Sequence, residues 1–208
     1  MEDPKKAPPG GAKACGHPTD AVSKWEGEAG HAPPALAEIR LDQNERLLVP
    51  FTTDVVEVQT HYLDYPSLRG YVRCNGSGCL LCRVGRQPER RDLLPVYDVI
   101  GGAVGVLPVS PNLRPHALRP QLTPVLRRLK DNERVLIAVR KPDRARYSVT
   151  QLPLPDGAAD GAGKIAEFLA KFGAGAIDLS SIYQKLTDKE LADVPEIATA
   201  LKARGITP

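Results

Sequence analysis

Four side chains that could together bind a soft metal ion lie close to one another in the sequence. His61 is followed after twelve residues by Cys74, and then by Cys79 and Cys82, which have two residues between them. Zn²⁺ prefers four thiolate or imidazole ligands in a tetrahedron, and a Cys₃His set supplied by the protein alone makes a structural site. The spacing of the last pair is that of a zinc knuckle, and the NGSG sequence of residues 75–78 is flexible enough to return Cys74 to it. These residues predict one bound Zn²⁺.

Other interpretations of the cysteines are disfavoured or stay open. Disulfides are not expected, because we find no hydrophobic signal segment and only four cysteines in 208 residues. A redox Cys-x₂-Cys is disfavoured because no βαβ pattern surrounds it and a third cysteine lies beside it. The thiols could also be reduced and unliganded. Cys15 and His17 form a second candidate pair, so a residue of the N-terminal segment could replace His61 as the fourth ligand.

Basic charge is concentrated in the part of the chain that carries these cysteines. Residues 61–150 contain 16 Lys and Arg against 7 Asp and Glu, whereas the net charge of the whole chain is +3. Arginine is suited to forked contacts with phosphate and to stacking on flat rings. The surplus therefore indicates a polyanionic partner. No run approaches 18 apolar residues, so we expect no membrane contact and a cytoplasmic protein.

Tyrosines are interleaved with these cations. Binding of single strands without sequence preference needs a positive groove for phosphates and flat rings on which bases stack. The candidate nucleic-acid contacts are Arg69, Tyr71, Arg73, Arg83, Arg86, Arg90, Arg91, Tyr97, Arg140, Lys141, Arg144, Arg146 and Tyr147. The aspartates of this region have no paired spacing and no histidine partner, so we expect a non-enzymatic protein without a small-molecule substrate.

Short strands are expected to position these residues. Apolar and β-branched runs predict strands over residues 46–51, 53–62, 93–100, 103–109, 134–141 and 145–152. The last two are expected to form a hairpin. Ser110-Pro111 and Thr123-Pro124 each have the pattern of an N-cap followed by Pro at the first helical position. Short strands with one helix before the final hairpin predict a mainly β fold with peripheral helices (α+β), built on a small barrel.

Composition divides the chain into three parts. We expect a flexible arm over residues 1–35, a metal-containing domain over 36–155 with its metal loop at 61–92, and a linker with C-terminal helices over 156–208. The arm is rich in Pro and Gly and lacks an apolar period. In the last part a helix is predicted over residues 164–172, and a capping box at Thr187 predicts another toward Ala203. We expect the helices of residues 164–204 to contact a protein partner or a second copy of the chain.

The metal spacing resembles that of a known family, the zinc-containing single-stranded DNA-binding proteins of tailed bacteriophages. The order of predicted strands, helix and terminal hairpin is also similar, over about residues 39–153. The resemblance implies an OB-fold barrel with an inserted zinc loop, and His61, Cys74, Cys79 and Cys82 as the zinc ligands. It further implies that the protein holds unpaired strands, DNA rather than RNA, during replication or recombination.

Two other functions are consistent with the same residues. In one, the protein is a zinc-bearing adaptor or accessory subunit of a larger nucleic-acid machine, and its basic face is either incidental or contacts RNA. In the other it is a nuclease accessory domain, which Mg²⁺-dependent cutting would reveal. Salt-dependent binding to isolated oligonucleotides separates the DNA-binding hypothesis from the adaptor hypothesis.

Overall fold

The computed structural model describes residues 36–143, 146–154 and 160–207. Its strands are β1 (Ala37–Glu38), β2 (Arg46–Pro50), β3 (Val56–Asp64), β4 (Arg69–Arg73), β5 (Glu89–Asp98), β6 (Ala103–Val109), β7 (Leu136–Arg140) and β8 (Ser148–Leu152). Its helices are α1 (Leu80–Arg83), α2 (Leu118–Lys130), α3 (Asp160–Gly173), α4 (Asp188–Ala192) and α5 (Pro195–Ala203), with 3₁₀ turns η2 (Gly76–Gly78) and η3 (Leu179–Ile182). The expected flexible arm and the candidate residues Cys15, His17 and Arg144 lie outside the described residues.

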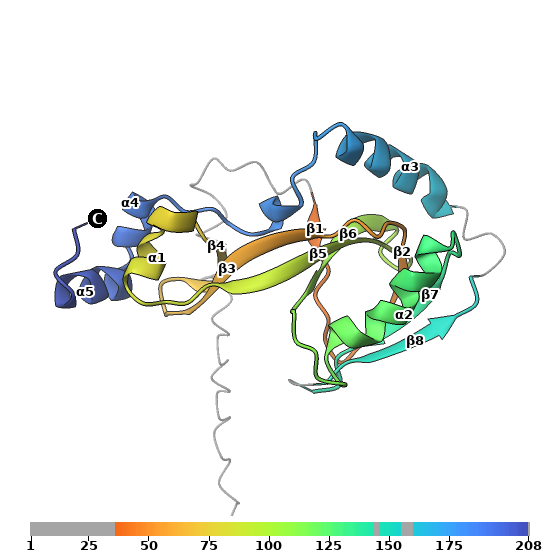
Figure 1. Cartoon of the computed structure of the whole chain (residues 1–208), viewed down its shortest axis with the longest axis horizontal. Helices are drawn as coiled ribbons and strands as arrows, with labels where there is room; N and C mark the ends of the chain where they lie inside the picture. The colour runs from red at the N-terminus through yellow and green to blue at the C-terminus, as the bar shows by residue number, and fades with distance from the viewer. Residues whose placement is uncertain (1–35, 144–145, 155–159, 208) are drawn as a thin grey trace, which may run out of the picture. The chain divides into compact units, whose positions relative to one another are not determined.

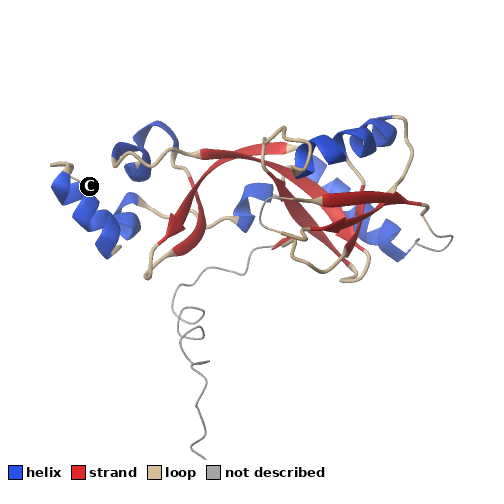
Figure 2. Cartoon of the chain, turned by 90° about the horizontal axis from the view of Figure 1, so that it is seen from below, coloured by secondary structure: helices blue, strands red, loops and turns tan. Residues whose placement is uncertain are grey.

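The strands form one mixed sheet. Hydrogen-bonded neighbours follow the order β1-β6-β5-β2-β7-β8, and β3 pairs with both β4 and β5. Among the strand ladders of the described residues, that of β1 with β6 is parallel and the others are antiparallel. Within the described part of the chain no ladder joins β1 to β8, so the sheet is open and the closed OB barrel is not confirmed. The structure is a mixed α+β protein with a core made mostly of sheet (Figures 1 and 2).

All six predicted strands are present, with ends that shift by up to four residues. Two further strands, β1 and β4, were not predicted. β4 lies inside the expected metal loop and makes a hairpin with β3, so part of that loop is regular structure. At one end of the sheet, where this hairpin extends, lie α1, α4 and α5, whereas α2 lies at the other end beside β7 and β8 (Figure 1).

The helix α2 covers one hydrophobic core of the sheet. Leu118, Leu122 and Val125 are buried at helical spacing and pack against residues of β5, β6 and β7. The helix therefore begins five residues before the predicted N-cap, and the pairs Ser110-Pro111 and Thr123-Pro124 do not begin helices. Two buried leucines contribute roughly 1.5–3 kcal/mol each. That offsets a cost of about 3 kcal/mol for a proline inside a helix.

The predicted C-terminal helix is interrupted. The capping box of Thr187 with Glu190 is present and opens α4, as predicted. A proline disfavours helical backbone at the residue before it. Val194, which precedes Pro195, accordingly has an extended ψ of 118°, and α5 begins as a separate helix with Pro at its first turn. None of the described helices has the length and apolar character needed to span a membrane.

Candidate metal centre and basic groove

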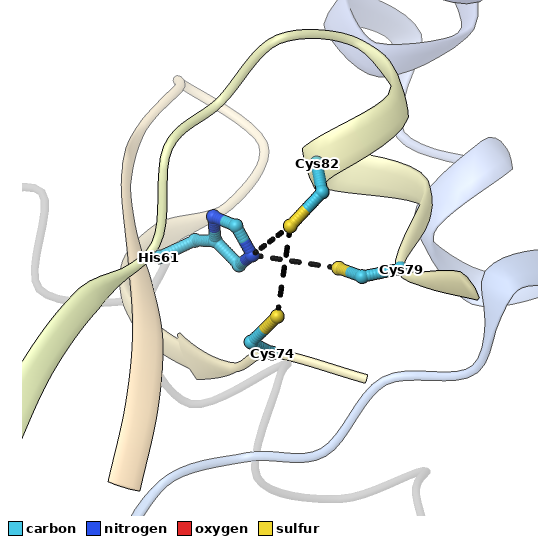
Figure 3. Close-up of side chains that lie close together, drawn as sticks. All are labelled: His61, Cys74, Cys79 and Cys82. Carbon is cyan, nitrogen blue, oxygen red and sulfur yellow. Dashed lines mark hydrogen bonds between the residues drawn. The ribbon is translucent and has the colours of Figure 1, made fainter. Parts of the chain in front are cut away.

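His61 and three cysteines converge at the end of the sheet that carries α1 (Figure 3). His61 belongs to β3, Cys74 follows β4, Cys79 precedes α1 and Cys82 lies within it. The four ligand atoms all lie within 4.8 Å of one another. The structure thus brings together the four residues whose spacing predicted a metal site, which we call the Cys₃His cluster.

Local backbone structure explains this convergence. The register of the β3–β4 hairpin places His61 opposite Val72, two residues before Cys74. The chain then reverses through η2, where Gly76 has a φ of +82° that favours glycine. Cys79 and Cys82 are three residues apart across the first turn of α1, so both face the hairpin.

The distances in the cluster fit one tetrahedral ion. The sulfurs of Cys74 and Cys82 are 3.7 Å apart, and His61 Nε2 lies 3.4 Å from Cys79 Sγ and 3.6 Å from Cys82 Sγ. A disulfide would need sulfurs about 2.05 Å apart. Zinc bonds of about 2.3 Å to sulfur and 2.05 Å to nitrogen imply about 3.8 Å between sulfurs and 3.6 Å between sulfur and nitrogen. The cluster can therefore hold a metal ion such as zinc.

The thiols of the cluster are also expected to be stabilised by a bound cation. Burial by itself raises the pKa of the Cys79 thiol. Hydrogen bonds from backbone groups, above all those of Cys82 and Asn75, outweigh the effect of burial, so the pKa of Cys79 is lowered. Burial, followed by the neighbouring Cys74 thiol, raises the pKa of Cys82 to about 12. Three thiolates this close repel one another unless a positive ion lies between them.

His61 is in the form that a metal binds. Its ring is almost completely buried, and this burial lowers the pKa of the imidazole, which keeps it neutral at pH 7. A weak interaction with the backbone of Gln87 opposes this lowering of the pKa. Its geometry is too loose for a standard hydrogen bond, so the buried Nδ1 has no hydrogen-bond partner among the described residues. Nε2 is the nitrogen directed at the cysteines.

The Cys₃His cluster shares a hydrophobic core with the C-terminal helices. Leu80 and Leu81 of α1 pack with Leu191, Ile197 and Leu201 of α4 and α5, and all five are at least 97% buried. Polar contacts fasten the same surfaces, since Ser67 donates to Glu196 at 2.7 Å and Asn75 donates to the Leu186 carbonyl at 2.9 Å. The C-terminal segment, expected to be separate, is packed against the metal loop. Its contact with a partner stays a prediction.

A basic groove of about 530 Å³ is lined by four of the candidate nucleic-acid contacts. Tyr71 and Arg91 line it from the β3–β4–β5 part of the sheet, and Lys141 and Tyr147 from the β7–β8 hairpin. Two further cations of its lining, Arg40 and Arg114, were not predicted. They lie outside the cysteine loop in sequence, and the folded sheet brings them to the same groove as Tyr71 and Arg91.

Each tyrosine of the groove has a cation over its ring. The Arg91 guanidinium lies 3.6 Å from the Tyr71 ring centroid, and Lys141 Nζ lies 5.3 Å from that of Tyr147. Tyr62, opposite Tyr71 in the hairpin, extends the aromatic surface with ring centroids 5.0 Å apart and is 42% exposed. Sequence reasoning missed Tyr62, because its pairing depends on the register of β4.

The other candidate arginines bond elsewhere, outside that groove. Their partners are Asp64 for Arg69 (2.9 Å), Asp178 for Arg73 (3.0 Å), the Thr207 carbonyl for Arg83 (2.9 Å), Tyr65 for Arg86 (2.9 Å), Glu57 and Asp92 for Arg90 (3.0 and 3.2 Å) and Asp143 for Arg146 (3.6 Å). Arg140 ends β7 and is exposed. The pairs of Arg69 and Arg146 are exposed and therefore weak, so they do not prevent these two side chains from meeting a phosphate.

Tyr97 needs a correction as a candidate base platform. Its ring is only 7% exposed and belongs to a core with Val49, Leu136 and Ile165. Gly161 of α3 packs so closely that an added Cβ would lie 2.7 Å from the ring. The sequence near a strand tyrosine does not show whether its ring is buried under another element or exposed to solvent. The covering helix α3 is more than 60 residues away in the chain.

Comparison with protein-family models, with curated proteins and with solved structures finds no match to this chain. Its function is therefore inferred from the geometry of the Cys₃His cluster and the basic groove.

Proposed function

We propose that the protein binds single-stranded DNA in the basic groove, without catalysing a reaction. The observation that carries the proposal is the pairing of two tyrosines with two cations in one groove, Tyr71 with Arg91 and Tyr147 with Lys141. Four cations and one carboxylate, Glu38, line the groove, so its charge attracts phosphates. The choice of DNA over RNA rests on the resemblance to the phage proteins.

The groove contains what sequence-neutral binding needs. Cations track the phosphates, and each base that stacks on an aromatic ring contributes roughly 1–3 kcal/mol. Tyr147 and Tyr62 offer ring surface beside the cations, since the first lines the groove and the second is 42% exposed. Stacking is tolerant of sequence because every base has a flat face. We accordingly infer little preference among sequences.

We also propose that the Cys₃His cluster binds one Zn²⁺ as a structural ion. Four protein ligands leave no open position for a substrate or a reactive water. The β3–β4 hairpin connects the ion to the groove. Its residue pair His61–Val72 includes a metal ligand, and the next pair, Tyr62–Tyr71, includes a residue of the groove lining. Successive strand residues point to opposite faces, so the cluster and the aromatic surface lie on opposite faces of this hairpin. Zinc would hold the hairpin that presents the tyrosines.

Substitutions in the groove test the proposal. Tyr147→Ala is expected to weaken binding of a fluorescent single-stranded oligonucleotide while the slope of log affinity against log salt stays the same, because stacking releases no ions. Lys141→Ala is expected to weaken binding and to flatten that slope by about 0.7. Lys202→Ala removes an exposed charge of α5 outside the groove and serves as the matched control. Equal effects of all three changes would contradict a groove-specific site and support the adaptor hypothesis.

A further inference from the structure

Arg91 is mostly buried, whereas Arg40 and Arg114 of the same groove are exposed. Its side chain is 15% exposed, whereas that of Arg40 is 86% exposed. Its one ion pair, with the exposed Glu89, has a distance of 3.6 Å, beyond that of a good hydrogen bond. Its Nε is buried and makes no hydrogen bond to the described residues. A buried charge with so little compensation is costly unless another acceptor binds it.

Tyr183 brings the C-terminal segment to this arginine. It follows η3, is 4% exposed, and its ring centroid lies 6.0 Å from that of Tyr71. Burial raises the pKa of Tyr183 to about 12, and the adjacent Arg91 guanidinium opposes the rise. The Tyr183 hydroxyl therefore makes a loose side-chain contact with the Arg91 guanidinium, and it has no hydrogen bond of standard geometry to any other described residue.

The backbone fixes Tyr183 in this position. Gln184 forms a parallel bridge with Val72 of β4, and its carbonyl accepts a hydrogen bond from the Arg73 N–H at 2.9 Å. Five residues earlier than Tyr183, Asp178 accepts from the Arg73 side chain at 3.0 Å. The segment from η3 to Gln184 thus lies beside β4. Tyr183 cannot move away from Arg91 without breaking these contacts.

The orientation of Arg91 is set before any ligand arrives. The ring of Tyr71 covers one face of the guanidinium at 3.6 Å, and Tyr183 lies beside it. The remaining exposed part belongs to the groove lining. A phosphate oxygen supplies the negative charge and the acceptor lone pairs that the guanidinium lacks, and a fixed fork binds it better than a mobile one.

We propose that Arg91 is a fixed phosphate-binding position of the groove and that Tyr183, from the C-terminal segment, is its positioning residue. This inference rests on the proposed function, since it assigns one phosphate of the bound strand to one arginine. It also gives the C-terminal segment a part in strand binding that the sequence did not predict. Arg40 and Arg114 would hold other phosphates less rigidly, because they are exposed.

The test compares an ordinary oligodeoxynucleotide with one of the same sequence whose linkages are uncharged methylphosphonates. Arg91→Ala is expected to lose at least about tenfold in affinity for the ordinary strand, and its salt slope should be about 0.7 shallower. It should match the wild type on the uncharged strand. Arg91→Lys keeps the charge but not the fork, so we expect weaker binding at an unchanged slope.

Tyr183→Phe tests the positioning role, since it removes only the hydroxyl group. We expect it to weaken binding several-fold in the wild-type background and to have no further effect in Arg91→Ala, because interacting residues are not additive. Metal content and thermal unfolding of Tyr183→Phe, measured in parallel, should stay close to those of the wild type. Lys202→Ala is again the charge control.

Three results would overturn the inference while leaving the proposed function intact. These are wild-type affinity of Arg91→Ala for the ordinary strand, an equal loss on the uncharged strand, or full additivity of Tyr183→Phe with Arg91→Ala. Failure of the wild-type protein to bind any single strand would instead remove the proposed function and this inference together.

Discussion

At the scale of single residues, the cluster of three thiols and one imidazole gives the clearest chemistry of the molecule. Three of the distances between ligand atoms match those around a tetrahedral ion, among them the 3.7 Å between the sulfurs of Cys74 and Cys82. Closely spaced thiolates are unfavourable without a cation, and metal binding to such a set contributes directly to folding. The metal is thus expected to be part of the folded state and not an addition to it.

Replacement of His61 tests the ligand set. We expect the purified wild-type protein to contain one Zn²⁺ per chain by elemental analysis and His61→Ala to lose most of it, because a three-ligand site is open to water. The matched control is Thr60→Ala, a buried neighbour in β3 whose hydroxyl bonds the Glu89 carbonyl and takes no part in the cluster. Full zinc occupancy in His61→Ala would move the fourth ligand to Cys15, His17 or solvent.

At the scale of elements, the C-terminal helices stabilise the metal loop. Ile197 of α5 is fully buried in the core that includes Cys79, Leu80 and Leu81. The side chain of an isoleucine in such a core contributes about 2–5 kcal/mol relative to alanine, including the cavity that its loss creates. The stability of α1, and with it the retention of metal, should therefore depend on α5.

Truncation of that side chain tests the dependence. Ile197→Ala is expected to lower the free energy of unfolding by roughly 2–5 kcal/mol and to speed zinc release to a chelator. Leu169→Ala in α3 is the control, because Leu169 is 39% exposed and should change both quantities little. Zinc release at the wild-type rate from a destabilised Ile197→Ala would show that α5 and the metal loop open independently.

The sequence predicts those elements whose determining contacts are local, and it misses those that depend on distant residues. The Cys₃His cluster could be predicted because its residues are joined by short connections, and the strands because their apolar patterns are local. The start of α2 could not, since burial of Leu118 and Leu122 outweighs the local signal of Thr123-Pro124. The role of Tyr183 depends on a bridge between Val72 and Gln184, more than 100 residues apart, which no local pattern shows.

At the scale of the whole molecule, the sheet gathers cations and rings from distant parts of the chain into one groove. Arg40, Arg91, Arg114 and Lys141 span a hundred residues of sequence and line the same hollow with Tyr147. The metal loop and the C-terminal segment both support the β3–β4 hairpin on which Tyr71 lies. We propose that this assembly recognises unpaired strands through phosphate contact and base stacking together.

The most direct measurement is a titration of the zinc-loaded protein against one sequence in single-stranded and duplex form, at several salt concentrations. We expect tighter binding of the single strand throughout, with log affinity falling linearly with log salt at about 0.7 per phosphate contact. The bases of a duplex are stacked on one another. A duplex can therefore place phosphates in the groove, but it has no free base to stack on Tyr147. Equal affinity for the two forms, or no binding at low salt, would contradict the account.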